Sequence, residues 1–135
     1  MFEQTPAEPV VVFVDDEEEI LEILRDIFSE APYRVHCFAR GKDAMRYAED
    51  QEVLAVVCDL YLKDVSGAEV LKHYQRVSPD TYRVLMTGYF DEEQEEQAKR
   101  EELFHQLIPK PWDIYGLRKE IDQIVTERSR RAEVR

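Results

Sequence analysis

Five times along the chain, a short apolar run precedes a longer stretch whose apolar residues recur at helical spacing. β-branched and aromatic residues dominate the strongest runs, as expected of strands that are covered on both faces. The runs are Val10–Val14, Tyr33–Phe38, Val53–Cys58, Tyr82–Met86 and Leu103–Ile108. The stretches predict helices from Glu17 to the Ala31-Pro32 pair, Gly41 to Glu49, Gly67 to Gln75, Asp91 to Glu102, and from Asp113 onward. This alternation predicts an α/β fold with a parallel sheet and right-handed crossovers.

The length and apolar content are those of one packed domain. The chain has 135 residues, of which 44% are hydrophobic, too many for a disordered acidic chain. We expect residues 1–9 to be a flexible lead-in and residues 10–127 to be the domain. The basic segment 128–135 is expected to be a frayed tail or the start of a linker.

The charge of the chain limits its partners. Against 30 Asp and Glu stand 18 Lys and Arg, a net charge of −12. Such a surface repels the phosphate backbone, which argues against direct binding of nucleic acid. The sequence has no apolar run of the ~18 residues needed to cross a membrane and no signal-peptide pattern at its start. Cys37 and Cys58 have no metal-ligand spacing, so a reducing cytoplasm is the expected location.

Polar residues follow four of the five predicted strands. They are Asp15 and Asp16, then Asp59, Thr87 and Lys110. In open parallel sheets, ligands bind outside the carboxyl ends of the strands. If the first and third strands are neighbours, three carboxylates meet there, and two of them ~4 Å apart repel by ~4 kcal/mol at an effective dielectric constant near 20. Protonation, the Lys110 ammonium or a divalent cation would relieve this repulsion.

This set of side chains suits phosphoryl transfer. Magnesium is usually held by one or two carboxylates while it keeps several waters. Asp59 would then be a plausible phosphoryl acceptor, because carboxylates form aspartyl-phosphate intermediates. Lys110 and Thr87 would supply a charge and a hydroxyl to the phosphoryl oxygens. Each residue alone has an ordinary structural interpretation as a helix cap or a turn, and only their joint order favours a site.

Four motifs in this order resemble the receiver domain of two-component response regulators, the class that includes the chemotaxis receivers. The motifs are Val-Phe-Val-Asp15-Asp16, Val-Val-Cys-Asp59-Leu with Gly67 eight residues on, Leu-Met-Thr87-Gly88-Tyr89 and Lys110-Pro111-Trp112. The resemblance extends from about Val10 to Val125. It implies a flavodoxin-like, doubly wound (βα)5 fold with a five-stranded parallel sheet in the order 2-1-3-4-5.

The resemblance also implies roles for the acids. Asp59 corresponds to the phosphoacceptor. Asp16 corresponds to the main Mg²⁺ ligand, with Asp15 assisting through water and Asp59 also contributing. The backbone carbonyl of Tyr61 corresponds to the remaining protein ligand.

Further roles follow for the last two motifs. Thr87 resembles the switch hydroxyl and Lys110 the lysine that contacts the phosphoryl group. The Lys110–Pro111 peptide is expected to be cis. Two departures from the family pattern affect switching: Lys63 stands where a proline is common, and Leu107 stands where an aromatic switch residue is usual.

Two tyrosines occupy positions that influence phosphoryl lifetime in such receivers. They are Tyr61 and Tyr89, and both are expected to modulate hydrolysis of the aspartyl phosphate. Leu107 is a third expected modulator, because it replaces the aromatic residue of the switch.

The implied function is a phosphorylation-activated switch, not an enzyme acting on an external substrate. A histidine kinase or phosphotransfer protein would donate a phosphoryl group to Asp59 with Mg²⁺. The fourth helix, fifth strand and fifth helix would then change conformation to control a downstream protein or a missing output domain. The Lys-Pro-Trp-Asp113 string is similar to receivers fused to HD-GYP phosphodiesterases or kinases. A homodimer through the same face is a further partner that the resemblance allows.

Two alternatives remain open. A Mg²⁺-dependent phosphohydrolase of related fold would want a second acid two residues past its nucleophile, where this chain has Tyr61. A receiver that binds partners without phosphorylation is kept open by Lys63 and Leu107, although the intact acids and Lys110 argue against it.

Overall fold

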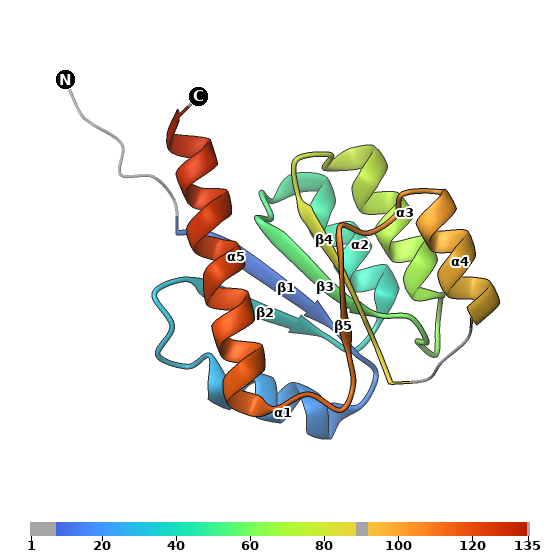
Figure 1. Ribbon diagram of the computed structural model, residues 1–135, viewed down its shortest axis with the longest axis horizontal. Coiled ribbons are helices and arrows are strands. Elements are labelled where there is room, and N and C mark those ends of the chain that lie inside the picture. Colours follow the sequence, from blue (N-terminus) through green and yellow to red (C-terminus); the bar gives the residue numbers. More distant parts are fainter. Residues whose placement is uncertain (1–7, 89–91, 135) are drawn as a thin grey trace.

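The strands form one parallel sheet in the order β2-β1-β3-β4-β5, which confirms the order implied by the family resemblance (Figure 1). The structure is a computed structural model and describes residues 8–88 and 92–134. The strands are β1 (Val10–Val14), β2 (Arg34–Phe38), β3 (Ala55–Asp59), β4 (Tyr82–Thr87) and β5 (Gln106–Pro109). The helices are α1 (Glu18–Ile27), α2 (Gly41–Asp50), α3 (Gly67–Val77), α4 (Glu92–Arg100) and α5 (Ile114–Val134).

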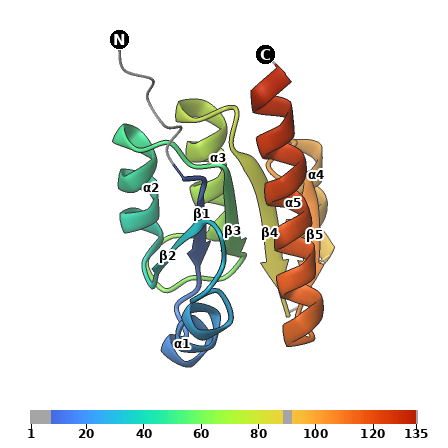
Figure 2. The ribbon, with the colours of Figure 1, turned by 90° about the vertical axis from the view of Figure 1, so that its left-hand side faces the viewer.

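Both faces of the sheet are buried, because successive residues of a strand point to opposite sides. In β1, Val10, Val12 and Val14 pack into the cluster beneath α2 and α3. The intervening Val11 and Phe13 pack into the cluster beneath α1 and α5. The result is a three-layer arrangement, and Figure 2 shows α2 and α3 on one side of the sheet and α5 on the other. The core contacts place α4 with α2 and α3, and α1 with α5.

The helices of the described part of the chain carry many charged residues. Within residues 8–88 and 92–134, none is both long enough and apolar enough to cross a bilayer. In α4, Ala98 is the buried residue, because the other residues of this helix are charged or carry side-chain amides. Asp91, the expected first residue of this helix, lies outside the described residues.

The predicted strand Leu103–Ile108 is wrong at its start. Glu102 has a positive φ of 55°, and the amide of Leu103 donates to the Ala98 carbonyl at 3.0 Å. The amide of Glu102 donates to the Lys99 carbonyl at 3.0 Å. This pair of bonds is a Schellman helix ending, in which the residue after the turn packs back on the helix. Leu103 is therefore buried as part of the end of α4, and β5 begins only at Gln106.

The C-terminal segment also differs from expectation. The apolar spacing that predicts the last helix ends at Val125, and residues 128–135 are expected to be a frayed tail or the start of a linker. The structure instead continues α5 as one helix to Val134. Arg128 holds this extension to the body of the protein, since its guanidinium lies 5.4 Å from the Tyr82 ring centroid and donates to the Asp80 carbonyl at 3.2 Å.

Gly67 lets the start of α3 approach the end of β3 closely. A Cβ atom at this position would lie 2.0 Å from the Asp59 carbonyl oxygen and 2.8 Å from the Leu60 Cα. The Gly67 amide donates to the Leu60 carbonyl at 2.8 Å. Because the blocking atoms are backbone, a side chain here cannot be accommodated without moving the end of β3.

We predict that Gly67→Ala lowers the free energy of unfolding by about 1–3 kcal/mol, the usual range for overpacking. Gly116→Ala in α5 is the matched control, because its Cβ would meet only the Asp113 carboxylate, at 3.3 Å. Urea denaturation of both variants measures the difference. Equal stabilities would contradict this account of the close approach.

Candidate functional site

Two buried carboxylates share one ammonium group at the carboxyl edge of the sheet. Asp15 follows β1 and is 0% exposed, and Asp59 ends β3 and is 8% exposed. Lys110 Nζ lies 2.6 Å from Asp15 Oδ2 and 3.0 Å from Asp59 Oδ2. The parallel pairing of β1 with β3, with Val14 opposite Cys58, brings the two acids side by side. Lys110 is 95 positions from Asp15 and 51 positions from Asp59 in the sequence, and the fold brings all three into one cluster.

Backbone amides engage the other oxygen of each carboxylate. The Glu17 amide donates to Asp15 Oδ1 at 2.9 Å. The Tyr61 amide donates to Asp59 Oδ1 at 3.4 Å. Each carboxylate is therefore oriented by its own following turn as well as by Lys110.

Burial and neighbouring charges shift the pKa values of Asp59 and Lys110 away from their ordinary values. Burial raises the pKa of Asp59, and the Asp15 charge adds to this, while the hydrogen bond and charge of Lys110 oppose it. For Lys110, burial alone would lower the pKa, but the hydrogen bonds and charges of both aspartates outweigh it and raise the pKa. The Lys110 ammonium therefore contributes to relieving the repulsion between the two carboxylates.

The ends of β4 and β5 position the Lys110 backbone. The Thr87 carbonyl accepts a hydrogen bond from the Lys110 amide at 2.9 Å, and Thr87 itself is 8% exposed. Gly88 leaves room for the lysine, since a Cβ there would lie 2.8 Å from Lys110 Cβ. The Lys110–Pro111 peptide is cis.

Not every residue singled out from the sequence joins this cluster. Asp16 is half-buried beside Asp15 and stands apart from the Lys110 ion pairs of the described residues. Tyr61 and Leu107 are half-buried against the core cluster beneath α2 and α3. Tyr89 lies outside the described residues. The indole of Trp112 donates to Met86 Sδ at 3.1 Å, which ties the residues before α5 to β4.

The donor chemistry at this edge fits Mg²⁺. Over residues 8–88 and 92–134, no three acidic, histidine or cysteine side chains are grouped as a ready-made metal site. Magnesium does not require one, because it is commonly held by one or two carboxylates together with waters. Asp15 and Asp59 carry buried carboxylate oxygens of the kind that Mg²⁺ binds, and Asp16 is directly adjacent in the chain.

Sequence reasoning missed one acid near the site, Asp64. It lies in the loop after β3, and its two carboxylate oxygens accept hydrogen bonds from the amides of Gly41 at 2.9 Å and Lys42 at 3.0 Å. Burial would raise the Asp64 pKa, but these and other backbone bonds outweigh it and hold the pKa low. A sequence signal for this contact was present. Arg40, directly before α2, forms no side-chain cap, so the first amides of the helix need an acceptor from another part of the chain.

We predict that Lys110→Met destabilises the protein by about 3–5 kcal/mol at pH 7, because removing one partner leaves buried charges uncompensated. The loss should shrink as the pH falls toward 5. Without the ammonium, the already raised Asp59 pKa rises further, so the folded state binds a proton more tightly than the unfolded state and gains stability at lower pH.

Chemical denaturation between pH 5 and pH 8 measures this dependence. The exposed Lys119 of α5 provides the control variant Lys119→Met, for which little change is expected at any pH. A Lys110→Met loss that does not vary with pH would contradict the shared-ammonium account.

Comparison with known proteins agrees with this geometry. Residues 11–122 match the family model of the response regulator receiver domain. The hydrogenase transcriptional regulatory protein HoxA of Bradyrhizobium diazoefficiens is 32% identical over 102 residues, which are 76% of this chain and 21% of that protein. Sporulation initiation phosphotransferase F of Bacillus subtilis is 25% identical over 109 residues, which are 80% of this chain and 86% of that protein.

Solved structures show the same architecture. The signal receiver domain of an HD domain-containing protein from Pseudomonas fluorescens has a TM-score of 0.85 and 26% identity, with 98% of this chain and 97% of that chain covered. A CheY-like receiver domain from Methanospirillum hungatei has a TM-score of 0.84 and 22% identity, with 93% of this chain and 99% of that chain covered. Strand order, buried acidic pair and family match together assign this chain to the response regulator receiver domains of two-component systems.

Proposed function

We propose that this chain is a phosphorylation-activated switch whose phosphoacceptor is Asp59. The observation that carries the proposal is the Lys110 ammonium, held between the carboxylates of Asp15 and Asp59 at 2.6 and 3.0 Å. This places a fixed positive charge beside an oxygen nucleophile, the arrangement that phosphoryl transfer requires of a protein. The curated relatives HoxA and AtoC are longer regulators: this chain spans 21% of HoxA and 27% of the regulatory protein AtoC of Escherichia coli.

In the proposed reaction, a carboxylate oxygen of Asp59 attacks the phosphorus of a phosphohistidine on a histidine kinase or phosphotransfer protein. The oxygen–phosphorus bond forms as the phosphorus–nitrogen bond breaks, and the electron pair stays on the imidazole. Lys110 then neutralises the new phosphoryl charge. The same residues would carry the hydrolysis that returns Asp59 to its free form, with Tyr61, Tyr89 and Leu107 as modulators.

Asp15, Asp16, Asp59 and the Tyr61 carbonyl are the proposed Mg²⁺ ligands. Bound Mg²⁺ would neutralise the carboxylates and orient the phosphoryl oxygens. Asp15 is held for this purpose by the Glu17 amide at 2.9 Å. Asp59 keeps its orientation through the Tyr61 amide.

The response would pass through Thr87 to the α4-β5-α5 face. The Thr87 carbonyl at the end of β4 accepts a hydrogen bond from the amide of Lys110, which follows β5. A shift of Lys110 toward a phosphoryl group would therefore act on both β4 and β5. α4 is attached to the body through few apolar contacts, because Ala98 is its buried residue. Phosphorylation would shift an existing equilibrium of these elements.

We propose that this face acts on a downstream protein, a second copy of the chain or an output domain. An HD-GYP phosphodiesterase or a kinase is the proposed kind of output domain, and the proposed location is the cytoplasm. The Pseudomonas fluorescens receiver, which belongs to an HD domain-containing protein, supports the first of these output types. The phosphohydrolase alternative is disfavoured, because Tyr61 supplies no second acid.

We predict that radiolabelled acetyl phosphate with Mg²⁺ labels the chain in an acid-stable, alkali-labile form and that Asp59→Asn abolishes the label. Phosphate incorporation is counted after gel separation. Asp26→Asn, which changes an exposed acid of α1, is the control and should label as the wild type does. Label that persists in Asp59→Asn would reject the acceptor, and an unlabelled wild-type chain would favour a receiver that acts without phosphorylation.

We also predict that Asp16→Ala weakens Mg²⁺ binding by about tenfold or more, because it removes a charged ligand. Titration calorimetry or the fluorescence of Trp112 measures the affinity. Glu19→Ala, at an exposed acid in the first turn of α1, controls for the loss of negative charge. An affinity unchanged by Asp16→Ala would remove this residue from the site.

A further inference from the structure

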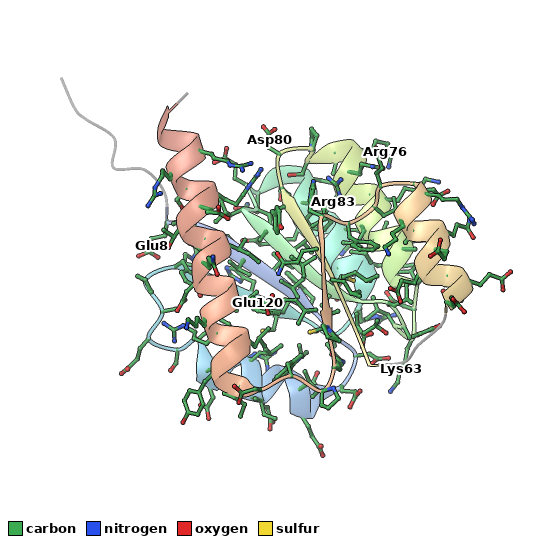
Figure 3. All side chains as sticks on the ribbon, in the orientation of Figure 1. Glu8, Lys63, Arg76, Asp80, Arg83 and Glu120 are labelled. Atoms are coloured by element: carbon green, nitrogen blue, oxygen red, sulfur yellow. The ribbon has the colours of Figure 1, made fainter. Side chains whose placement is uncertain are left out.

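The loop between β3 and α3 carries the backbone that faces Asp59. It runs from Leu60 to Ser66 and includes Tyr61, whose amide donates to Asp59 Oδ1 at 3.4 Å. Lys63, near its middle, is exposed and lies at the edge of the sheet (Figure 3). A proline at that position would restrict the backbone, and lysine does not. The restraint on this loop therefore comes from hydrogen bonds and packing with other elements.

Asp64 ties the loop to a helix that is distant in sequence. Its carboxylate accepts hydrogen bonds from the amides of Gly41 at 2.9 Å and Lys42 at 3.0 Å, across 23 and 22 residues. The first amides of a helix have no partner within the helix, and Arg40, the residue before α2, forms no side-chain cap. Asp64 therefore supplies the cap from another element, with its negative charge at the positive end of the helix dipole.

Apolar contacts hold the same junction closed. A Cβ at Gly41 would lie 2.5 Å from Val65 Cγ2 and 2.8 Å from Val70 Cγ2. A side chain at position 41 would therefore require Val65 of the loop and Val70 of α3 to shift. Movement of the loop away from α2 would lose this packing together with the two hydrogen bonds of Asp64.

The two ends of the loop are fixed separately. Gly67 donates to the Leu60 carbonyl at 2.8 Å, and Ser66 caps α3 by accepting from the Glu69 amide at 3.1 Å. Tyr61 lies between the Leu60 anchor and the Asp64 anchor. Release of Asp64 would free the loop on the side of Tyr61 that is farther from β3.

We infer that Asp64 is a positioning residue for the phosphorylation site, an inference that rests on the proposed function of Asp59. By capping α2 it holds the loop so that the Tyr61 backbone stays oriented toward Asp59 and the proposed Mg²⁺ position. It takes over the restraint that a proline at position 63 would provide. Its role is indirect, because it contacts the amides of α2 and not the phosphoryl group.

The test compares Asp64→Ala with Asp64→Asn and Asp43→Ala. Asn caps helices about as well as Asp, so Asp64→Asn should restore most of the function that Asp64→Ala loses. Asp43 is an exposed acid in the first turn of α2, so Asp43→Ala removes the same charge from the same helix end while the cap remains. The readouts are amide hydrogen exchange of the metal-free chain, Mg²⁺ affinity and the rate of labelling by acetyl phosphate.

In Asp64→Ala, exchange should rise at least about fivefold at residues 41–42 and 60–66, while β1 and β3 keep their protection. Mg²⁺ affinity should fall about fivefold, the factor that corresponds to loss of one ordinary cap. Asp43→Ala should behave as the wild type. Unchanged exchange and affinity in Asp64→Ala would overturn the inference, as would an equal effect of Asp43→Ala or no rescue by Asp64→Asn.

The outcomes also separate this inference from the proposed function. If the wild-type chain takes label and Asp59→Asn does not, but Asp64→Ala binds Mg²⁺ and labels normally, only the positioning role fails. If the wild-type chain takes no label and binds no Mg²⁺, the proposed function fails and the positioning role fails with it. Exchange that rises equally across β1 and β3 would show general destabilisation and would reject positioning.

Discussion

The structure depends on the burial of two carboxylates under a single ammonium group. Asp15 and Asp59 are almost fully removed from water, where their mutual repulsion is weakly screened and each carries a desolvation cost. Lys110 offsets both through two hydrogen bonds. One cation for two anions leaves the cluster with excess negative charge, so it retains an affinity for further positive charge. That residual imbalance is the physical basis for the proposed metal binding and phosphoryl chemistry.

The register between neighbouring strands of the sheet brings the residues of this cluster together. β1 and β3 are neighbours, and Val14 pairs with Cys58, so the next residue of each strand is an aspartate at the same edge. Thr87 pairs with Pro109 in β5, which brings Lys110 to that edge as well. The central strands β1 and β3 are apolar on both faces and buried between helices (Figure 2), so their polar residues lie at the carboxyl end of the sheet.

The elements that sequence patterns predicted well are those in which apolar periodicity and burial agree. The alternating faces of β1 and the N-cap of α5 at Asp113, which accepts from the Gly116 amide at 3.1 Å, are local signals. Leu103 was misassigned to a strand because a buried leucine is equally suited to the start of a strand and to the end of a helix. A Schellman ending usually has glycine at the position that Glu102 occupies, so the usual signal was missing.

The sequence by itself determined that this chain has an α/β fold with a parallel sheet, because strand and helix periodicities are local properties of the residues. It also placed acids, a threonine and a lysine at the strand ends. It also indicated the receiver family through four short motifs. Only the tertiary structure decided that Lys110 bridges Asp15 and Asp59 and that Asp64 caps α2. Both depend on hydrogen bonds between groups 22 to 95 positions apart, and such bonds exist only after parallel strand pairing has brought the loops together.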